Sequence, residues 1–193
     1  ILIGNEEDFQ LALGIKGPEA GGKDLSAKIE GFKGMIEEVK KAYPNASVFA
    51  TTLREVISAN EHLWGAILNA GGKWNVADPR PIPVLDRIGG GDGFVGGLLY
   101  GILRGFSYED CLHFGWATGV LATTVLTDYA TPADESQVLQ IADREEAEGR
   151  NRLNSASRHR VCLSFPNYPV VTSRCASQSI GRVHRATLAA SQR

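Results

Sequence analysis

Hydrophobic positions in the first fifty residues alternate between extended and helical spacing. Residues 1–4 have the pattern of the end of a buried strand, and a helix with acidic residues in its first turn is predicted from Asn5 to Gly14. After a loop rich in Gly, apolar residues recur every three or four positions with Lys and Glu between them: Leu25, Ile29, Phe32, Ile36, Val39 and Tyr43. This spacing predicts an amphipathic helix that ends before Pro44.

The middle of the chain changes to extended segments. Residues 47–52 form a short apolar run that predicts a buried strand. Residues 63–68 and 74–76 flank a Gly-Gly turn, which is the pattern of a hairpin. Alternate prolines then keep the chain extended, and residues 84–85 predict one more short strand.

Helical spacing returns in the following residues. Helices are predicted over 91–103, over 108–124 with Ser107 as N-cap, and over 133–141 after a proline. Strands and helices therefore alternate, which favours an α/β fold with helices on the faces of a sheet. The predicted strands are too few for a complete doubly wound domain.

The composition is typical of a chain with one hydrophobic core, since 43% of its 193 residues are hydrophobic and 22% are charged. The apolar runs are shorter than the roughly 20 residues of a membrane-spanning helix, and no signal-type segment opens the chain, so we expect a cytoplasmic protein without membrane contact. Cys111, Cys162 and Cys175 lack the spacing of metal ligands and are interpreted as free thiols. The apolar start without Met suggests that the chain begins inside a domain.

The charge divides the chain near residue 142. Residues 1–142 hold 11 Lys and Arg against 18 Asp and Glu, whereas residues 143–193 hold 9 against 4. Region 142–193 is rich in Arg and Ser and keeps neither helical nor strand periodicity, so we expect a disordered extension or a stretch foreign to the body at 1–141. Such a tail could bind nucleic acid, but aromatic-basic interleaving is missing, and we expect no nucleic-acid partner.

Gly89-Gly90-Gly91-Asp92, before the predicted helix at 91–103, is the stretch most informative about chemistry. Three consecutive glycines leave backbone N–H groups uncovered and allow positive φ, so the loop can wrap around a phosphate. The helix N-terminus favours negative charge at the same place, and the Asp92 carboxylate could accept the proton of an attacking alcohol. Gly96, Gly97 and Gly101 indicate close packing against another backbone or a ligand. A flexible linker ending in an N-cap is the alternative interpretation of the loop.

A longer pattern argues against a mere linker. Asp86-x-x-Gly-x-Gly-Asp92, followed by Phe94 and a helix of small residues, resembles the C-terminal signature of the PfkB, or ribokinase-like, carbohydrate kinases. Within this stretch, Arg87-Ile88 and Gly89-Gly90-Gly91-Asp92 resemble the sequences of the 2-keto-3-deoxygluconate kinases. The segments Asn5-Glu6-Glu7-Asp8 and Thr52-Leu53-Arg54-Glu55 resemble the same kinases. The resemblance covers residues 1 to 141 and stops before the tail.

The resemblance implies an α/β/α sandwich of which this chain holds the C-terminal, nucleotide-binding and catalytic half. It also implies ATP as the phosphoryl donor and Mg²⁺ on the phosphates. Position by position, Asp92 matches the catalytic base of the family, and Gly89, Gly90 and Gly91 match its anion hole.

Two further family elements match in part. Asn5 and Asp8 match an N-x-x-E element near the phosphates and magnesium, but Asp is one methylene shorter than Glu, which implies a contact through water. A solvated first helical turn is the alternative for these acids. Thr52 matches the Thr of a T-x-G phosphate-binding turn, whereas Arg54 stands where Gly is usual, so both are expected at the nucleotide but with an altered turn.

Three other residues can be interpreted as either functional or structural. Arg87 could pair with the carboxylate of a sugar acid, although an Arg beside a crowded loop is more often structural. His113 and Trp116 lie in the predicted second helix, where relatives line an adenine pocket with small residues, and we interpret both as core residues.

Two functions remain open at this point. The first is ATP-dependent phosphorylation of a sugar hydroxyl, with 2-keto-3-deoxygluconate, converted to its 6-phosphate, preferred over another hexose, a pentose or a nucleoside. The second is a non-catalytic fragment that at most binds nucleotide, because the family's sugar site comes largely from an N-terminal half that nothing here matches. The expected partners are ATP and a sugar acid, and a homo-oligomer is compatible with either function.

Overall fold

The computed structural model of the protein describes residues 1–18, 25–130, 132 and 134–142, with the side chains of the first long helix described from residue 28 onward. These residues belong to one compact unit, Ile1–Ser155. The expected tail at 142–193 begins at the last of them, so its predicted disorder lies outside the described residues, as do Cys162 and Cys175.

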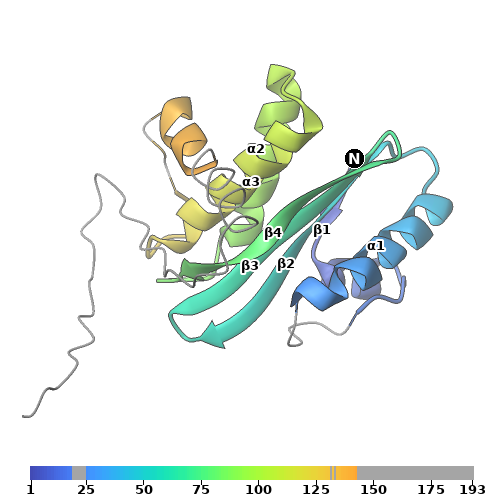
Figure 1. Cartoon of the computed structure of the whole chain (residues 1–193), viewed down its shortest axis with the longest axis horizontal. Helices are drawn as coiled ribbons and strands as arrows, with labels where there is room; N and C mark the ends of the chain where they lie inside the picture. Colours follow the sequence, from blue (N-terminus) through green and yellow to red (C-terminus); the bar gives the residue numbers. More distant parts are fainter. Residues whose placement is uncertain (19–24, 131, 133, 143–193) are drawn as a thin grey trace, which may run out of the picture. The chain divides into compact units, whose positions relative to one another are not determined.

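Among the described residues, four strands form one sheet in the order β1-β2-β3-β4 (Figure 1). They are β1 (Leu2–Gly4), β2 (Val48–Ser58), β3 (Glu61–Ala70) and β4 (Lys73–Pro83). β1 is parallel to β2, and the other neighbours are antiparallel. The predicted hairpin is confirmed, because Gly71 and Gly72 connect β3 to β4 with φ of 56° and 80°, as a two-residue turn requires.

Two strand predictions were wrong. β2 continues past residue 52 to Ser58, because its polar residues remain paired with β3. Residues 84–85 do not form a strand, because their backbone is held elsewhere: the N–H of Val84 donates to the carbonyl of Asn60 (2.9 Å) and that of Leu85 to the carbonyl of Thr123 (2.8 Å). The chain therefore leaves the sheet directly after β4.

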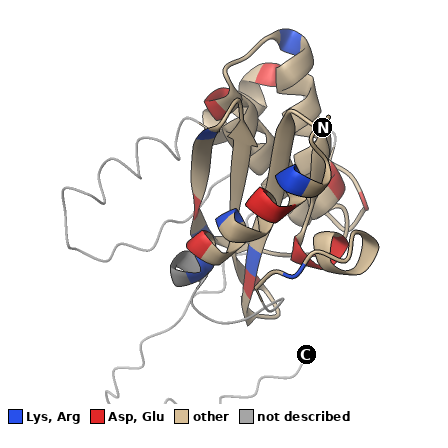
Figure 2. Ribbon diagram, turned by 90° about the vertical axis from the view of Figure 1, so that its right-hand side faces the viewer, with Lys and Arg blue, Asp and Glu red and all other residues tan. Residues whose placement is uncertain are grey.

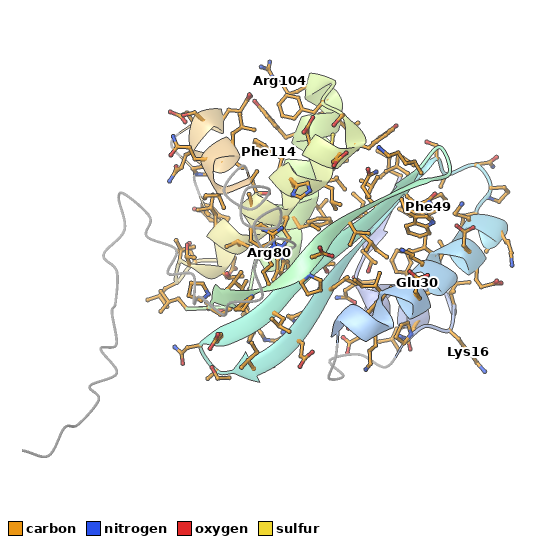
Figure 3. All side chains as sticks on the ribbon, viewed as in Figure 1. Lys16, Glu30, Phe49, Arg80, Arg104 and Phe114 are labelled. Atoms are coloured by element: carbon orange, nitrogen blue, oxygen red, sulfur yellow. The ribbon has the colours of Figure 1, made fainter. Side chains whose placement is uncertain are left out.

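Helix α1 (Leu25–Ala42) covers one face of the sheet, as the sequence spacing predicts. Its apolar side joins the sheet and the short π-helix η1 (Asp8–Ala12) in one core: Phe9, Phe32, Met35, Ile36, Val39, Phe49, Leu53 and Ile67. Figure 3 shows Phe49 between the sheet and α1. The other side of α1 carries three Glu–Lys ion pairs at i, i+3 spacing, and Figure 2, which looks onto this helix, shows its charges facing the viewer.

Helices α2 (Gly90–Arg104) and α3 (Tyr108–Thr123) cover the opposite face. The two helices approach closely at their glycines: a Cβ at Gly93 would lie 2.8 Å from the carbonyl oxygen of Thr118, and one at Gly115 would lie 2.9 Å from that of Phe94. Gly97 and Gly101 lie in the same contact, which confirms the expected close packing there. Gly96 differs, because a Cβ at this position would meet open space.

The ends of these helices are defined by local contacts. Ser107 caps α3 as predicted, accepting a hydrogen bond from the backbone N–H of Asp110 at 3.1 Å. A further helix over residues 135–142 is joined to α2 by a hydrogen bond that the Tyr100 hydroxyl donates to Glu135. Cys111 is a buried free thiol. None of the described helices is both long enough and apolar enough to cross a membrane.

Candidate active site

The loop between β4 and α2 is fastened to the end of α3. The backbone N–H groups of Leu85 and Asp86 both donate to the carbonyl of Thr123, at 2.8 and 3.3 Å. The Asp86 carboxylate accepts a hydrogen bond from the N–H of Ile88 at 3.0 Å, which folds the loop back on itself. This anchoring places residues 87–89 directly before the N-terminus of α2.

Gly89 is the N-cap of α2 and has a φ of 83°. A Cβ at this position would collide with the backbone carbonyl of Asp128, so both the backbone angle and the packing require Gly. The Gly89 carbonyl accepts the first helical hydrogen bond, from the N–H of Gly93 at 2.8 Å. The predicted loop-to-helix transition is therefore present, and its helix starts one residue earlier than expected.

The next three residues differ in their access to solvent. Gly90 is buried, and a Cβ there would lie 3.5 Å from the Trp64 ring and 3.1 Å from the Thr123 methyl group. Gly91 faces open space, and Asp92 is exposed in the first turn of α2. Because the first N–H groups of a helix lack intrahelical partners, this open end can bind an anion beside the Asp92 carboxylate.

A cavity of about 260 Å³ lies against this helix end. It is lined by Asp92, Gly96 and Gly97 of α2, by Thr118 and Leu121 of α3, and by residues 128–130 and 132. Thr118 supports its wall, because its hydroxyl donates to the carbonyl of Gly93 at 2.7 Å. Residues 128–130 and 132 were not predicted at this site, because no local sequence pattern connects them to Asp92.

Asn5 and Asp8 bind each other reciprocally. The Asn5 side chain accepts from the N–H of Asp8 at 2.9 Å, and the Asp8 carboxylate accepts from the N–H of Asn5 at 2.8 Å. This is the geometry of a capping box, which satisfies the first donors of the helix. Gly4 pairs with Thr51 in the parallel β1–β2 ladder. The next residue of each segment, Asn5 and Thr52, therefore follows at the same end of this ladder.

Thr52 and Arg54 lie on the face of the sheet that α2 and α3 cover. Arg54 is opposite Trp64 in the β2–β3 ladder. Trp64 in turn packs against Gly90 at the start of α2. The Trp64 carbonyl accepts a hydrogen bond from the Trp116 indole N–H of α3 at 3.0 Å. Because side chains alternate along a strand, Thr52 shares the side of Arg54. Figure 3 shows Arg80, opposite Trp64 on β4, on this side as well.

His62 is a residue of this face that the sequence interpretation missed. Burial lowers the pKa of His62, and the positive charges of Arg54 and Arg87 lower it further. Arg54 and Arg87, for which separate roles are predicted from the sequence, therefore both act on the charge of one imidazole. The available signal was the alternation of His62, Trp64 and Ala66, which places a polar side chain on an otherwise apolar face.

The interpretation of Trp116 and His113 as core residues is confirmed. Trp116 is 1% exposed, and its indole N–H donates a hydrogen bond to the Trp64 carbonyl. His113 is also buried in α3. Arg87, in contrast, is exposed in the loop.

Comparison with known proteins gives matches over the same region. The pfkB family carbohydrate kinase model matches residues 1–133. The 2-dehydro-3-deoxygluconokinase structure from Thermotoga maritima aligns with a TM-score of 0.64 and 30% identity, over 74% of this chain and 41% of that one.

Two curated relatives match at the level of sequence. The 5-dehydro-2-deoxygluconokinase of Clostridium tetani is 24% identical over 151 residues, 77% of this chain and 39% of that protein. The 1-phosphofructokinase of Escherichia coli (strain K12) is 38% identical over 68 residues, 35% of this chain and 20% of that protein. The chain spans at most about two fifths of the length of these relatives. Because the family match covers residues 1–133, including the Gly89–Asp92 loop, this chain belongs to the pfkB family of carbohydrate kinases.

Proposed function

We propose that the chain is the nucleotide-binding and catalytic portion of a kinase that transfers the γ-phosphoryl group of ATP to a sugar hydroxyl. The observation that carries this proposal is the exposed Asp92 at the open N-terminus of α2, beside the 260 Å³ cavity. A carboxylate and a set of backbone N–H groups at one helix end are two of the components that phosphoryl transfer to an alcohol uses.

In the proposed reaction Asp92 accepts the proton of the sugar hydroxyl as its oxygen attacks the γ-phosphorus. The bond between that phosphorus and the β,γ-bridging oxygen breaks, and ADP leaves with the bonding electrons. The N–H groups at Gly89, Gly90 and Gly91 and the helix dipole stabilise the negative charge on the transferring group. A proton acceptor in this position contributes about 10²- to 10⁴-fold to the rate.

The residues present fit a magnesium ion held mainly by substrate phosphates. Mg²⁺ keeps several waters and uses one or two protein carboxylates, so a dedicated cage is unnecessary. Asp8 is exposed and uses one carboxylate oxygen, Oδ2, for the N–H of Asn5, which leaves the other oxygen for a water on the metal. Bound magnesium would supply charge neutralisation of the phosphates.

For the acceptor we propose 2-keto-3-deoxygluconate, phosphorylated at its 6-hydroxyl. The support is the likeness to the Thermotoga maritima 2-dehydro-3-deoxygluconokinase and an exposed Arg87, which can bind a carboxylate in bidentate fashion. A different sugar is the alternative, because the Escherichia coli relative is a 1-phosphofructokinase.

A second candidate function is nucleotide binding without catalysis. The observation that favours it is coverage: the chain spans 41% of the Thermotoga maritima structure, so parts of that protein have no counterpart in the alignment. Formation of sugar phosphate by the 193-residue chain separates the two candidates. Detectable product supports the kinase, whereas ATP binding with no product supports the second candidate.

Asp92→Asn tests the base directly. We expect ATP affinity to stay within about twofold, while turnover falls by about 10²- to 10⁴-fold, because Asn cannot accept the proton. The measurements are ATP titration by calorimetry and product formation by a coupled assay. Asp78→Asn, an exposed residue of β4, is the matched control and should leave both unchanged. Near-normal turnover in Asp92→Asn would exclude Asp92 as the base.

A further inference from the structure

Arg54, His62 and Arg87 converge on one side of the sheet from three different segments. Arg54 lies on β2 opposite Trp64, and His62 is two residues before Trp64 on the same face of β3. Arg87 belongs to the loop before α2, and this loop begins beside His62, because the N–H of Val84 donates to the carbonyl of Asn60 at 2.9 Å. The positive charges of both arginines act on the His62 ring. Trp64 also packs on Gly90, so this cluster borders the N-terminus of α2.

Arg54 and Arg87 bring two positive charges to this cluster. Among the described residues, neither Arg54 nor Arg87 takes part in an ion pair. His62 is 5% exposed, and within the described part of the chain its side chain makes no hydrogen bond. The charges of both arginines act on the His62 ring, and an anion bound beside them would offset these charges and accept hydrogen bonds from the guanidinium groups.

We propose that Arg54, His62 and Arg87 form a single oxyanion-binding subsite next to the Gly89–Asp92 loop. Its ligand is a phosphate of the nucleotide or the carboxylate of the sugar acid, and this choice of ligands rests on the proposed function. Both groups present coplanar or tetrahedral oxygens that accept the paired N–H donors of a guanidinium, and a neutral imidazole adds one further N–H. The subsite gives Arg54 a role that a Gly at this position could not perform.

The subsite is tested by titrating the 193-residue chain at constant ionic strength with two probes, inorganic tripolyphosphate and gluconate. The variants are Arg54→Gln and Arg87→Gln. The matched control is Arg104→Gln, which removes the same charge at the opposite end of α2, where Arg104 interacts with Glu135. Calorimetry gives the affinities, and circular dichroism checks that each variant is folded.

We expect both variants to bind one of the probes at least about tenfold more weakly, while Arg104→Gln stays within about twofold. Weakening for tripolyphosphate assigns the subsite to phosphate, and weakening for gluconate assigns it to carboxylate. The proposal is overturned if the folded variants bind both probes as Arg104→Gln does, or if the unmodified chain binds neither probe at millimolar concentration.

The His62 ring supplies a readout that general charge effects would not move. Its NMR signals, assigned with His62→Gln, should shift when the effective probe is added to the unmodified chain, and this shift should disappear in the Arg54→Gln, Arg87→Gln double variant. No shift in the unmodified chain would contradict the role of His62. If the probe binds through these residues but the chain forms no sugar phosphate, the result counts against the proposed kinase activity alone. If the chain forms sugar phosphate but the Arg→Gln variants bind the probes as tightly as the unmodified chain, the result counts against the subsite alone.

Discussion

At the scale of single residues, Gly89 and Gly91 are the same amino acid with different structural requirements. Gly89 has a φ of 83° and leaves no room for a Cβ beside the Asp128 carbonyl. Gly91 has no atoms within 4 Å of a Cβ position and is outside the positive-φ glycines. The first glycine is needed for the backbone to turn into α2, and the second keeps the helix end open to a ligand.

This difference predicts a larger loss of stability for one Ala substitution than for the other. Gly89→Ala should lower the free energy of unfolding by about 1 to 3 kcal/mol, because Ala is strained at positive φ and would displace the 128 carbonyl. Gly91→Ala should change it by no more than about 1 kcal/mol, since Ala is the better helix former. Urea unfolding of both variants gives the comparison. Equal destabilisation would contradict a requirement for Gly at position 89.

At the scale of elements, α3 positions the loop of the candidate active site. Its last residue, Thr123, accepts the N–H groups of Leu85 and Asp86, and its residue Thr118 supports the cavity wall. The other end of α3 is fixed by Ser107, whose hydroxyl oxygen accepts from the N–H of Asp110. The stability of this helix therefore affects the geometry of the loop that carries Asp92.

Removing the cap should cost stability without unfolding the protein. Ser107→Ala should lower the free energy of unfolding by about 1 kcal/mol, because one N–H at the helix start loses its acceptor. Ser47→Ala, an exposed residue just before β2, is the matched control and should change it by less than about 0.5 kcal/mol. Chemical denaturation measures both, and a similar loss in the two variants would argue against capping by Ser107.

At the scale of the whole described unit, the two faces of the sheet differ: one packs against α1, and the other carries the candidate site. The face under α1 is filled by apolar side chains such as Ile36 and Phe49, whereas the opposite face carries Arg54, His62 and the start of α2. A loss of packing under α1 should therefore affect folding more than ligand binding.

Ile36→Ala tests this separation. Ile36 is fully buried, so its truncation should lower the free energy of unfolding by about 2 to 5 kcal/mol. Leu103→Ala, at an 87% exposed position of α2, should change it by less than about 0.5 kcal/mol. Below the unfolding transition, tripolyphosphate affinity should match that of the unmodified chain for both. A marked loss of affinity in folded Ile36→Ala would show that the two faces are coupled.

The features that depend on neighbouring residues were predictable from the sequence. The spacing of Phe32, Ile36 and Val39 specifies an amphipathic helix, Ser107 specifies a cap, and Gly71-Gly72 specifies a hairpin turn, because each signal is read within a few residues. The Gly89–Asp92 loop was recognisable for the same reason. Its pattern is contiguous, and its resemblance to the PfkB family agrees with the family match over residues 1–133.

Contacts between distant segments could not be predicted from local patterns. Leu85 lies outside the sheet because its N–H donates to the Thr123 carbonyl. Gly89 lies against the Asp128 carbonyl. A local sequence pattern shows neither contact. The convergence of Arg54, His62 and Arg87 likewise depends on strand register and on where the loop is anchored. Local sequence was enough to predict the Gly89–Asp92 loop and its family, whereas packing sets which side chains surround the loop, because strand register and helix contact depend on residues far apart in the chain.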